Sequence, residues 1–211
     1  STDFGPTMFR DALCTDVIAD MDMEFMAFQP AIVFINGEYW GLHNIRERID
    51  ENYLSQNHPV DSDNINLLAL AGEVEEGNAE NFFNLIDYVS SNDLAQEVHY
   101  QAVAERVDID NFMDYYISQL YFANFDWPFV NIRYWQPQAE NGPWRWIFHD
   151  CDRCLLSSQY NHLNEFFETN ILDADLLDPS TRIFNELLKN DGFRAQFVQR
   201  FMYHLSTTFK A

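Results

Sequence analysis

The sequence predicts an α+β protein, and two observations carry this prediction. Apolar residues recur at helical spacing over Thr7–Met21 and again through 78–124, which predicts helices with one buried face. Between these segments, a β-rich run, the pair Asn36-Gly37 and a second aromatic run predict a β-hairpin. At 211 residues, 47% of them hydrophobic, the chain is long enough for one substantial domain or two small lobes with a proper core.

Taken in chain order, the predicted elements are helices separated by short strands. They are a helix over Thr7–Met21, a hairpin within 31–45, a short helix through Leu54, a strand over Asn64–Leu70, a connection over Gly72–Gly77, helices over Asn78–Asn92, Leu94–Val107 and Asp108–Asn124, strands over Val130–Trp135 and Trp144–His149, and helices over Ser180–Asn190 and Phe193–Phe209.

Local chemistry sets the ends of several of these elements. Asn36 and Gly37 supply the positive φ angles of a two-residue hairpin turn. Asp50 and Asp108 are suited to cap the helices that follow them, because a short carboxylate accepts hydrogen bonds from the first backbone N–H groups. Pro128 ends the helix before it, since proline cannot continue the hydrogen-bonding pattern.

Some segments are predicted to be irregular. Gln138–Gly142 is a turn, Ser158–Asn170 is irregular, Asp173–Pro179 is an acidic loop, and Gly192 separates the last two helices. The helix at 78–92 is expected to bury Phe82, Phe83, Ile86 and Val89.

The charge of the chain limits its partners. Its 34 acidic and 12 basic residues give a net charge of −22, which argues against nucleic acid or an anionic membrane surface as the main partner. Lys189 and Lys210 are the only lysines, so any anion in the fold must be bound by arginine, a metal ion or backbone N–H groups. No apolar run reaches the roughly 20 residues that span a bilayer. The acidic, lysine-poor composition suits an exported protein or a high-salt habitat.

The three cysteines are too few for a disulfide framework. Cys151 and Cys154 form a C-x-x-C motif, which can bind zinc or carry out redox chemistry. With no second pair in the sequence, we interpret them as two small apolar side chains.

The residues with the clearest chemistry lie between Asn124 and Asp152. Asp126, Asn131, Asp150 and Asp152 fall at the ends of a predicted hairpin, where their side chains can converge. Phosphoryl transfer needs such groups: a carboxylate that accepts the proton of the attacking hydroxyl, and an amide and carboxylates that hold Mg²⁺ against phosphates. The alternative is that these short polar side chains only satisfy backbone groups of turns.

Three segments together resemble the CotH-type (spore coat protein H-like) kinase family. They are PAIVFINGEYWGLHNIRERIDENYL at 30–54, YFANFDWPFVNIRYW at 121–135 and WRWIFHDCD at 144–152. The resemblance implies a divergent protein-kinase-like fold. It further implies transfer of the γ-phosphate of ATP to a serine or threonine hydroxyl of a protein, with Mg²⁺ or Mn²⁺. The expected lobes are an N-terminal α/β lobe at 1–77, with a reduced β-sheet and truncated upstream, and a mainly helical C-terminal lobe at 78–211 that carries the hairpin.

The resemblance also assigns residue roles. Asp126 resembles the catalytic aspartate, Asn131 the amide metal ligand, and Asp150 or Asp152 the metal-binding aspartate. Glu47 resembles a residue on the nucleotide side of the cleft, where a kinase normally pairs it with a phosphate-binding lysine.

Two departures from the family pattern keep other functions open. The fragment has no lysine near Glu47, so either Arg46 or Arg48 grips the phosphates or the lysine lies upstream. Arg153 and Cys154 replace the more usual glycine and aromatic residue, and Arg153 is placed to pair with Asp150. An inactive binding module of a larger exported or surface protein of a bacterium is therefore the main alternative, and a metal-dependent hydrolase is a third.

Overall fold

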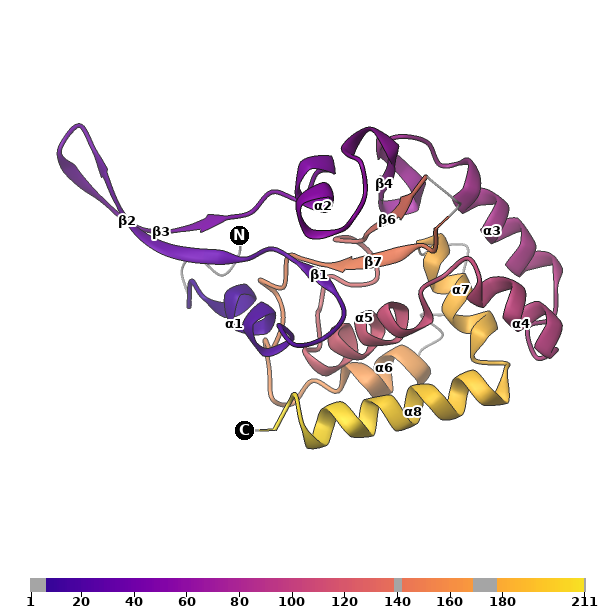
Figure 1. Ribbon diagram of the computed structural model, residues 1–211. Coiled ribbons are helices and arrows are strands. Elements are labelled where there is room, and N and C mark those ends of the chain that lie inside the picture. Colours follow the sequence, from indigo (N-terminus) through magenta and orange to yellow (C-terminus); the bar gives the residue numbers. More distant parts are fainter. Residues whose placement is uncertain (1–6, 139–141, 169–177, 211) are drawn as a thin grey trace.

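The computed structural model describes residues 7–138, 142–168 and 178–210 (Figure 1). Its helices are α1 (Arg10–Val17), α2 (Glu51–Asn57), α3 (Glu80–Ser91), α4 (Glu97–Ala104), α5 (Ile109–Tyr121), α6 (His162–Glu168), α7 (Pro179–Leu187) and α8 (Asp191–Ser206). Its strands are β1 (Glu24–Phe25), β2 (Phe28–Ile35), β3 (Glu38–Arg46), β4 (Ile65–Ala69), β5 (Glu73–Glu76), β6 (Arg133–Pro137) and β7 (Arg145–Phe148). Short 3-10 turns occupy Ser62–Asn64 and Leu70–Gly72.

A mixed five-stranded sheet forms the centre of the molecule, so the α+β prediction is confirmed. The strand order is β1-β7-β6-β4-β5, in which β1 runs parallel to β7 and the other neighbours are antiparallel. Tyr134 pairs with Trp146, which sets β6 and β7 side by side as the predicted second hairpin. Strand β4 pairs with β6, so strands from both 1–77 and 78–211 share one sheet. The division of the chain into two lobes stays a prediction.

The first hairpin stands apart from this sheet. Strands β2 and β3 pair only with each other and extend away from the rest of the molecule (Figure 1). Asn36 and Gly37 have φ values of 53° and 85°, as the turn prediction requires. Several large apolar side chains of the hairpin are more than half exposed: Ile32, Phe34, Tyr39, Trp40, Leu42 and Ile45.

Helix α5 lies against the central sheet and is buried almost throughout its length. Asp108 caps it by accepting a 3.1 Å hydrogen bond from the backbone N–H of Asn111, as predicted. Phe112 packs against Trp146 of β7, with ring centroids 4.4 Å apart. Burial of each such large side chain contributes about 1.5–3 kcal/mol, which fixes the end of α5 relative to β7.

Four details differ from the sequence-based predictions. The segment Glu73–Glu76 is an edge strand, not a connection, and α6 forms inside the segment predicted to be irregular. Helix α8 begins at Asp191 with Asn190 as its cap, so Gly192 lies inside the helix. Phe83 is 45% exposed because the core takes Phe82 and Leu85 instead. The predicted turn at 138–142 and acidic loop at 173–179 fall largely outside the described residues.

The helices are also short or polar in relation to the thickness of a bilayer. Among the described helices, none has both the length and the apolar composition needed to cross a bilayer.

Candidate functional site

Asn131 and Asp150 lie at the same end of the β6–β7 pair. Asn131 comes shortly before β6 begins, and Asp150 follows the end of β7, so the antiparallel pairing brings them together. Asn131 Nδ2 donates to the backbone oxygen of Asp150 at 3.5 Å. Both residues have left-handed backbone conformations, with φ of 60° and 53°, a region that asparagine and aspartate tolerate better than most residues. The backbone turns sharply at both positions and leaves both side chains partly exposed.

Helix α1 holds the Asp-x-Asp segment (residues 150–152) from the other side. Asp11 Oδ1 accepts a 2.6 Å hydrogen bond from the backbone N–H of Cys151, and an Arg10 guanidinium nitrogen donates to the backbone oxygen of Asp152 at 2.9 Å. Arg46, at the end of β3, forms an ion pair with Asp11. The structure therefore brings Arg46 to the Asp-x-Asp segment through Asp11.

Arg153 joins Asp126 to the same segment. Its guanidinium lies 2.9 Å from Asp126 Oδ1 and stacks over the ring of Phe125, 4.7 Å from the ring centroid. The expected pairing of Arg153 with Asp150 is thus replaced by a pairing with Asp126. The reason is the turn after α5, which places Asp126 beside the loop that follows β7: the backbone N–H of Phe125 donates to the carbonyl of Arg153 at 3.4 Å.

The electrostatics of Asp150 favour a cation. Burial raises the pKa of Asp150, and the neighbouring charges of Asp152 and Asp11 raise it further, while Arg46 opposes them. Asp152, the like-charged neighbour, is itself 7% exposed. Burial, with the nearby charge of Arg133, lowers the pKa of His149 to about 4, so its imidazole supplies no positive charge at neutral pH.

Glu47 lies at a different place from the other predicted site residues. Its carboxylate accepts a 2.9 Å hydrogen bond from the backbone N–H of Ala27 at the base of the first hairpin. It lines a pocket of about 320 Å³ whose wall also includes Glu24, Tyr53 and His58. Arg46 and Glu47 are neighbours in the sequence but contact different groups, as expected for consecutive side chains of an extended segment.

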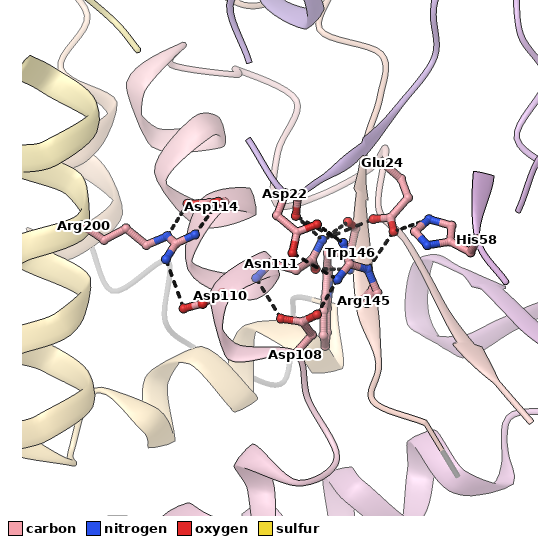
Figure 2. Close-up of polar contacts among 10 residues, drawn as sticks. All are labelled: Asp22, Glu24, His58, Asp108, Asp110, Asn111, Asp114, Arg145, Trp146 and Arg200. Atoms are coloured by element: carbon pink, nitrogen blue, oxygen red, sulfur yellow. Dashed lines mark hydrogen bonds and ion pairs between the residues drawn. The ribbon is translucent and has the colours of Figure 1, made fainter. Parts of the chain in front are cut away.

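A second group of charged residues fixes the opposite end of β7 (Figure 2). Arg145 lies 2.7 Å from Glu24 and 2.9 Å from Asp22, and it also pairs with Asp108 at the start of α5. His58 contacts Glu24 at 2.9 Å. Burial would raise the pKa of Glu24, but His58 and Arg145 outweigh it, and the pKa lies below its usual value. This Arg145 group (Arg145 with Asp22, Glu24 and Asp108) holds β1, β7 and α5 together.

Helix α8 is joined to α5 by a separate ion pair, also drawn in Figure 2. Arg200 contacts both carboxylate oxygens of Asp114, at 2.5 and 2.8 Å, and reaches Asp110 at 3.0 Å. His204 lies 3.0 Å from Asp114 as well. Burial would raise the pKa of Asp114, but hydrogen bonds from Arg200 and His204 hold it below its usual value. These contacts of Arg200 and His204 with Asp114 are structural, because they fix α5, the helix that precedes Asp126.

The acidic side chains of the site are more widely spaced than in a closed cation cage. Across residues 7–138, 142–168 and 178–210, the only group of three histidine, cysteine or acidic side chains with ligand atoms within 4.8 Å is Cys14, Cys151 and Cys154. Mg²⁺ usually keeps several waters and binds one or two carboxylates together with substrate phosphates. The donors Asn131, Asp150 and Asp152 fit that pattern, in which phosphates complete the coordination.

These features define an α+β protein with an acidic site in the loops beside an antiparallel strand pair. The sequence model of the family described as CotH kinase protein matches residues 2–211, and the chain therefore belongs to this family. The resemblance found in the sequence is thereby confirmed over essentially the whole chain. No curated protein matches the chain.

Sequence reasoning missed the contribution of α1 to the site. Asp11 is 6% exposed and lies three residues before Cys14 and seven before Ile18, both of which are fully buried. That spacing places Asp11 on the core face of its helix. A carboxylate at a core position needs a partner, so this pattern was the signal that could have found it.

Proposed function

We propose that this domain binds ATP with Mg²⁺ or Mn²⁺ beside the Asp-x-Asp segment and transfers the γ-phosphate to a serine or threonine hydroxyl of a protein. Two contacts at one end of β6 and β7 carry the proposal. Asn131 donates to the backbone oxygen of Asp150 at 3.5 Å, and Asp126 pairs with Arg153 of the loop after β7. Family membership supports the same activity. A divergent kinase-like fold is part of the proposal.

Each polar group has a separate role in it. Asn131, Asp150 and Asp152 would hold the metal ion, which neutralises charge on the phosphates when it is bound. Asp126 orients the attacking hydroxyl and accepts its proton. Arg46, positioned by Asp11, is the proposed cation that contacts a phosphate, because guanidinium groups bind phosphate oxygens in pairs. Glu47 would act on the nucleotide side from its own pocket, which Glu24 and His58 also line.

One contact favours a second candidate function, an inactive binding module. A guanidinium nitrogen of Arg153 lies 2.9 Å from Asp126 Oδ1, so the proposed base is already paired in this structure. In an active enzyme, that pair must open or turn when the acceptor hydroxyl enters. In a binding module, it stays closed.

Export from the cell belongs to the same proposal. Cys151 and Cys154 form a disulfide, which is typical of proteins in oxidising compartments. This pairing replaces the interpretation of the two residues as small apolar side chains. The lysine-poor, acidic composition supports export as well.

A phosphotransfer assay separates the two functions. The chain is incubated with γ-labelled ATP, Mg²⁺ or Mn²⁺ and a serine-rich acceptor protein, and labelled acceptor is counted. We expect transfer by the native chain and a loss of about 10²-fold or more in Asp126→Asn, because general base catalysis contributes that much. Asp16→Asn, on the exposed face of α1, is the matched control. Equal transfer by Asp126→Asn and Asp16→Asn would rule out the assigned base, and no transfer with intact nucleotide binding would favour the binding module.

A further inference from the structure

Three cysteine sulfurs meet beneath the Asp-x-Asp segment. Cys14 comes from α1, and Cys151 and Cys154 come from the loop after β7, yet all three sulfurs lie within 4.8 Å of one another. Each of the three residues is fully buried in the main hydrophobic core. Cys151 and Cys154 are joined as a disulfide, and Cys14 completes the group from a segment 137 positions earlier in the chain.

We propose that, when this disulfide is reduced, Cys14, Cys151 and Cys154 bind one thiophilic metal ion, Zn²⁺ or Cu⁺. Thiolate sulfur selects such ions over Mg²⁺, which prefers oxygen. Two sulfurs bound to one zinc ion lie about 3.8 Å apart, given bonds of about 2.3 Å in tetrahedral geometry. After reduction, the bonded sulfurs of Cys151 and Cys154 must therefore move apart to that spacing, whereas Cys14, within 4.8 Å of both, is already close to it.

The apolar surroundings strengthen this assignment. Three thiolates inside a hydrophobic core are unfavourable without a cation. Bound Zn²⁺ offsets more of their charge than Cu⁺ does. Complete burial also protects the sulfurs from exchange with solvent, as in structural metal sites. A C-x-x-C pair with one further cysteine from a distant segment is a suitable ligand set, and the distant ligand makes the site depend on the fold.

Reduction of the disulfide precedes binding of the metal ion. Reduction breaks the sulfur–sulfur bond of Cys151 and Cys154, consumes two electrons and two protons, and yields two thiols. A phosphine supplies the electrons and becomes the phosphine oxide, taking its oxygen from water. When the ion binds, the three thiols release their protons to solvent and each sulfur forms one bond to the metal. The disulfide and the ion therefore exclude each other.

The site would act on the position of α1. That helix also supplies Arg10 and Asp11, which contact the backbone of residues 151 and 152. A metal ion shared by Cys14 and Cys151 would join α1 to the Asp-x-Asp segment independently of those hydrogen bonds. The sulfur site and the oxygen site lie next to each other, and their ligands differ enough to bind different ions.

The test uses the full chain kept under a phosphine reductant without oxygen. Zn²⁺ and Cu⁺ are offered in separate titrations against chromophoric chelators, and native mass spectrometry counts the ions bound. We expect one ion per reduced chain from at least one titration, and binding at least about tenfold weaker in Cys14→Ser. Leu13→Ser, an exposed neighbour in α1, should bind as the native chain does.

Absence of binding by the reduced native chain would overturn the proposal, and so would equal binding by the Cys14→Ser and native chains. If Cys14→Ser does not fold, the oxidised native chain gives the same comparison without a mutation. It should bind no ion at this site, and binding unchanged by oxidation would also contradict the proposal. Because the assay contains no nucleotide, its outcome is independent of phosphotransfer activity.

Discussion

Strand β7 has a group of carboxylates at each end, and the two groups differ in how their charge is balanced. At its start, Arg145 lies among Asp22, Glu24 and Asp108, and the pKa of Glu24 is lowered. At its end, Asp150 has Asp152 and Asp11 as like-charged neighbours, and its pKa is raised. The first group is satisfied by the protein alone and stabilises the fold. The second contains a carboxylate whose ionised form is disfavoured, which is typical of a functional site.

The largest expected difference between the two ends concerns Arg145. Replacing it in Arg145→Met removes one of the two basic partners of the buried Glu24 carboxylate, and we expect a loss of about 3–5 kcal/mol in the free energy of unfolding. Urea denaturation measures it. Arg133→Met is the matched control, because Arg133 and Glu75 form a more exposed pair, and its loss should stay below about 1 kcal/mol. Similar losses in the two variants would contradict the structural role of the Arg145 group.

Glu24→Gln should have a smaller effect of the same sign. It removes a charge that is hydrogen-bonded to Arg145 and His58, and such bonds contribute about 1.5–3 kcal/mol. Because the folded-state pKa of Glu24 is lowered, its stabilisation is present above the unfolded-state value of 4.5 and is lost as the pH falls through the folded-state value. The difference between the native chain and Glu24→Gln, measured by urea denaturation across pH, should therefore shrink in acid. A constant difference would argue against a charged Glu24.

Asp150→Asn should have the opposite sign. In the metal-free protein it removes a charge that burial and the repulsion from Asp152 and Asp11 make unfavourable, so we expect a gain of about 0.5–2 kcal/mol at neutral pH. Because the folded-state pKa is raised, the cost of ionised Asp150 is complete above that pKa and disappears below the unfolded-state value of 3.8. Thermal unfolding across pH measures the gain. A loss of stability at neutral pH would show that Asp150 is a structural residue.

The smallest expected effect belongs to Arg153→Ala. Its guanidinium and the Asp126 carboxylate are 36% and 23% exposed, so the pair should contribute less than about 1 kcal/mol to stability. Urea denaturation of this variant beside Arg145→Met compares one cation from each end of β7. If Arg153→Ala and Arg145→Met lost similar free energies of unfolding, Arg153 would stabilise the fold as Arg145 does, which would contradict its assignment to the candidate site.

Local signals in the sequence predicted much of the fold. The Asn36-Gly37 turn, the Asp50 and Asp108 caps and the helices at 80–121 depend on residues close together in the chain, and all of them are present. Strand β1 was not predicted, because it has two residues and its partner in β7 lies 123 positions later. Helix α6 was missed because seven residues are too few to show a helical period.

The candidate site divides in the same way. The spacing along one predicted hairpin singled out Asp126, Asn131, Asp150 and Asp152. In the structure Asn131 contacts the backbone of Asp150, Asp126 pairs with Arg153, and the assignment of the four residues to one site stays a prediction. Asp11 could not be assigned to them by spacing, because its contact with Cys151 spans 140 positions. Arg46 and Glu47, both assigned to the nucleotide side, contact different groups: Arg46 pairs with Asp11, and Glu47 accepts from the backbone of Ala27.

The most direct test of the account is nucleotide binding with the metal ion as a variable. Isothermal titration calorimetry with an unreactive ATP analogue should show binding by the native chain that requires Mg²⁺ or Mn²⁺. In the double variant Asp150→Asn with Asp152→Asn, this metal-dependent binding should be lost while the fold remains intact. Metal-dependent binding that survives the double change would contradict the assignment of the acidic end of β7 as the cation site.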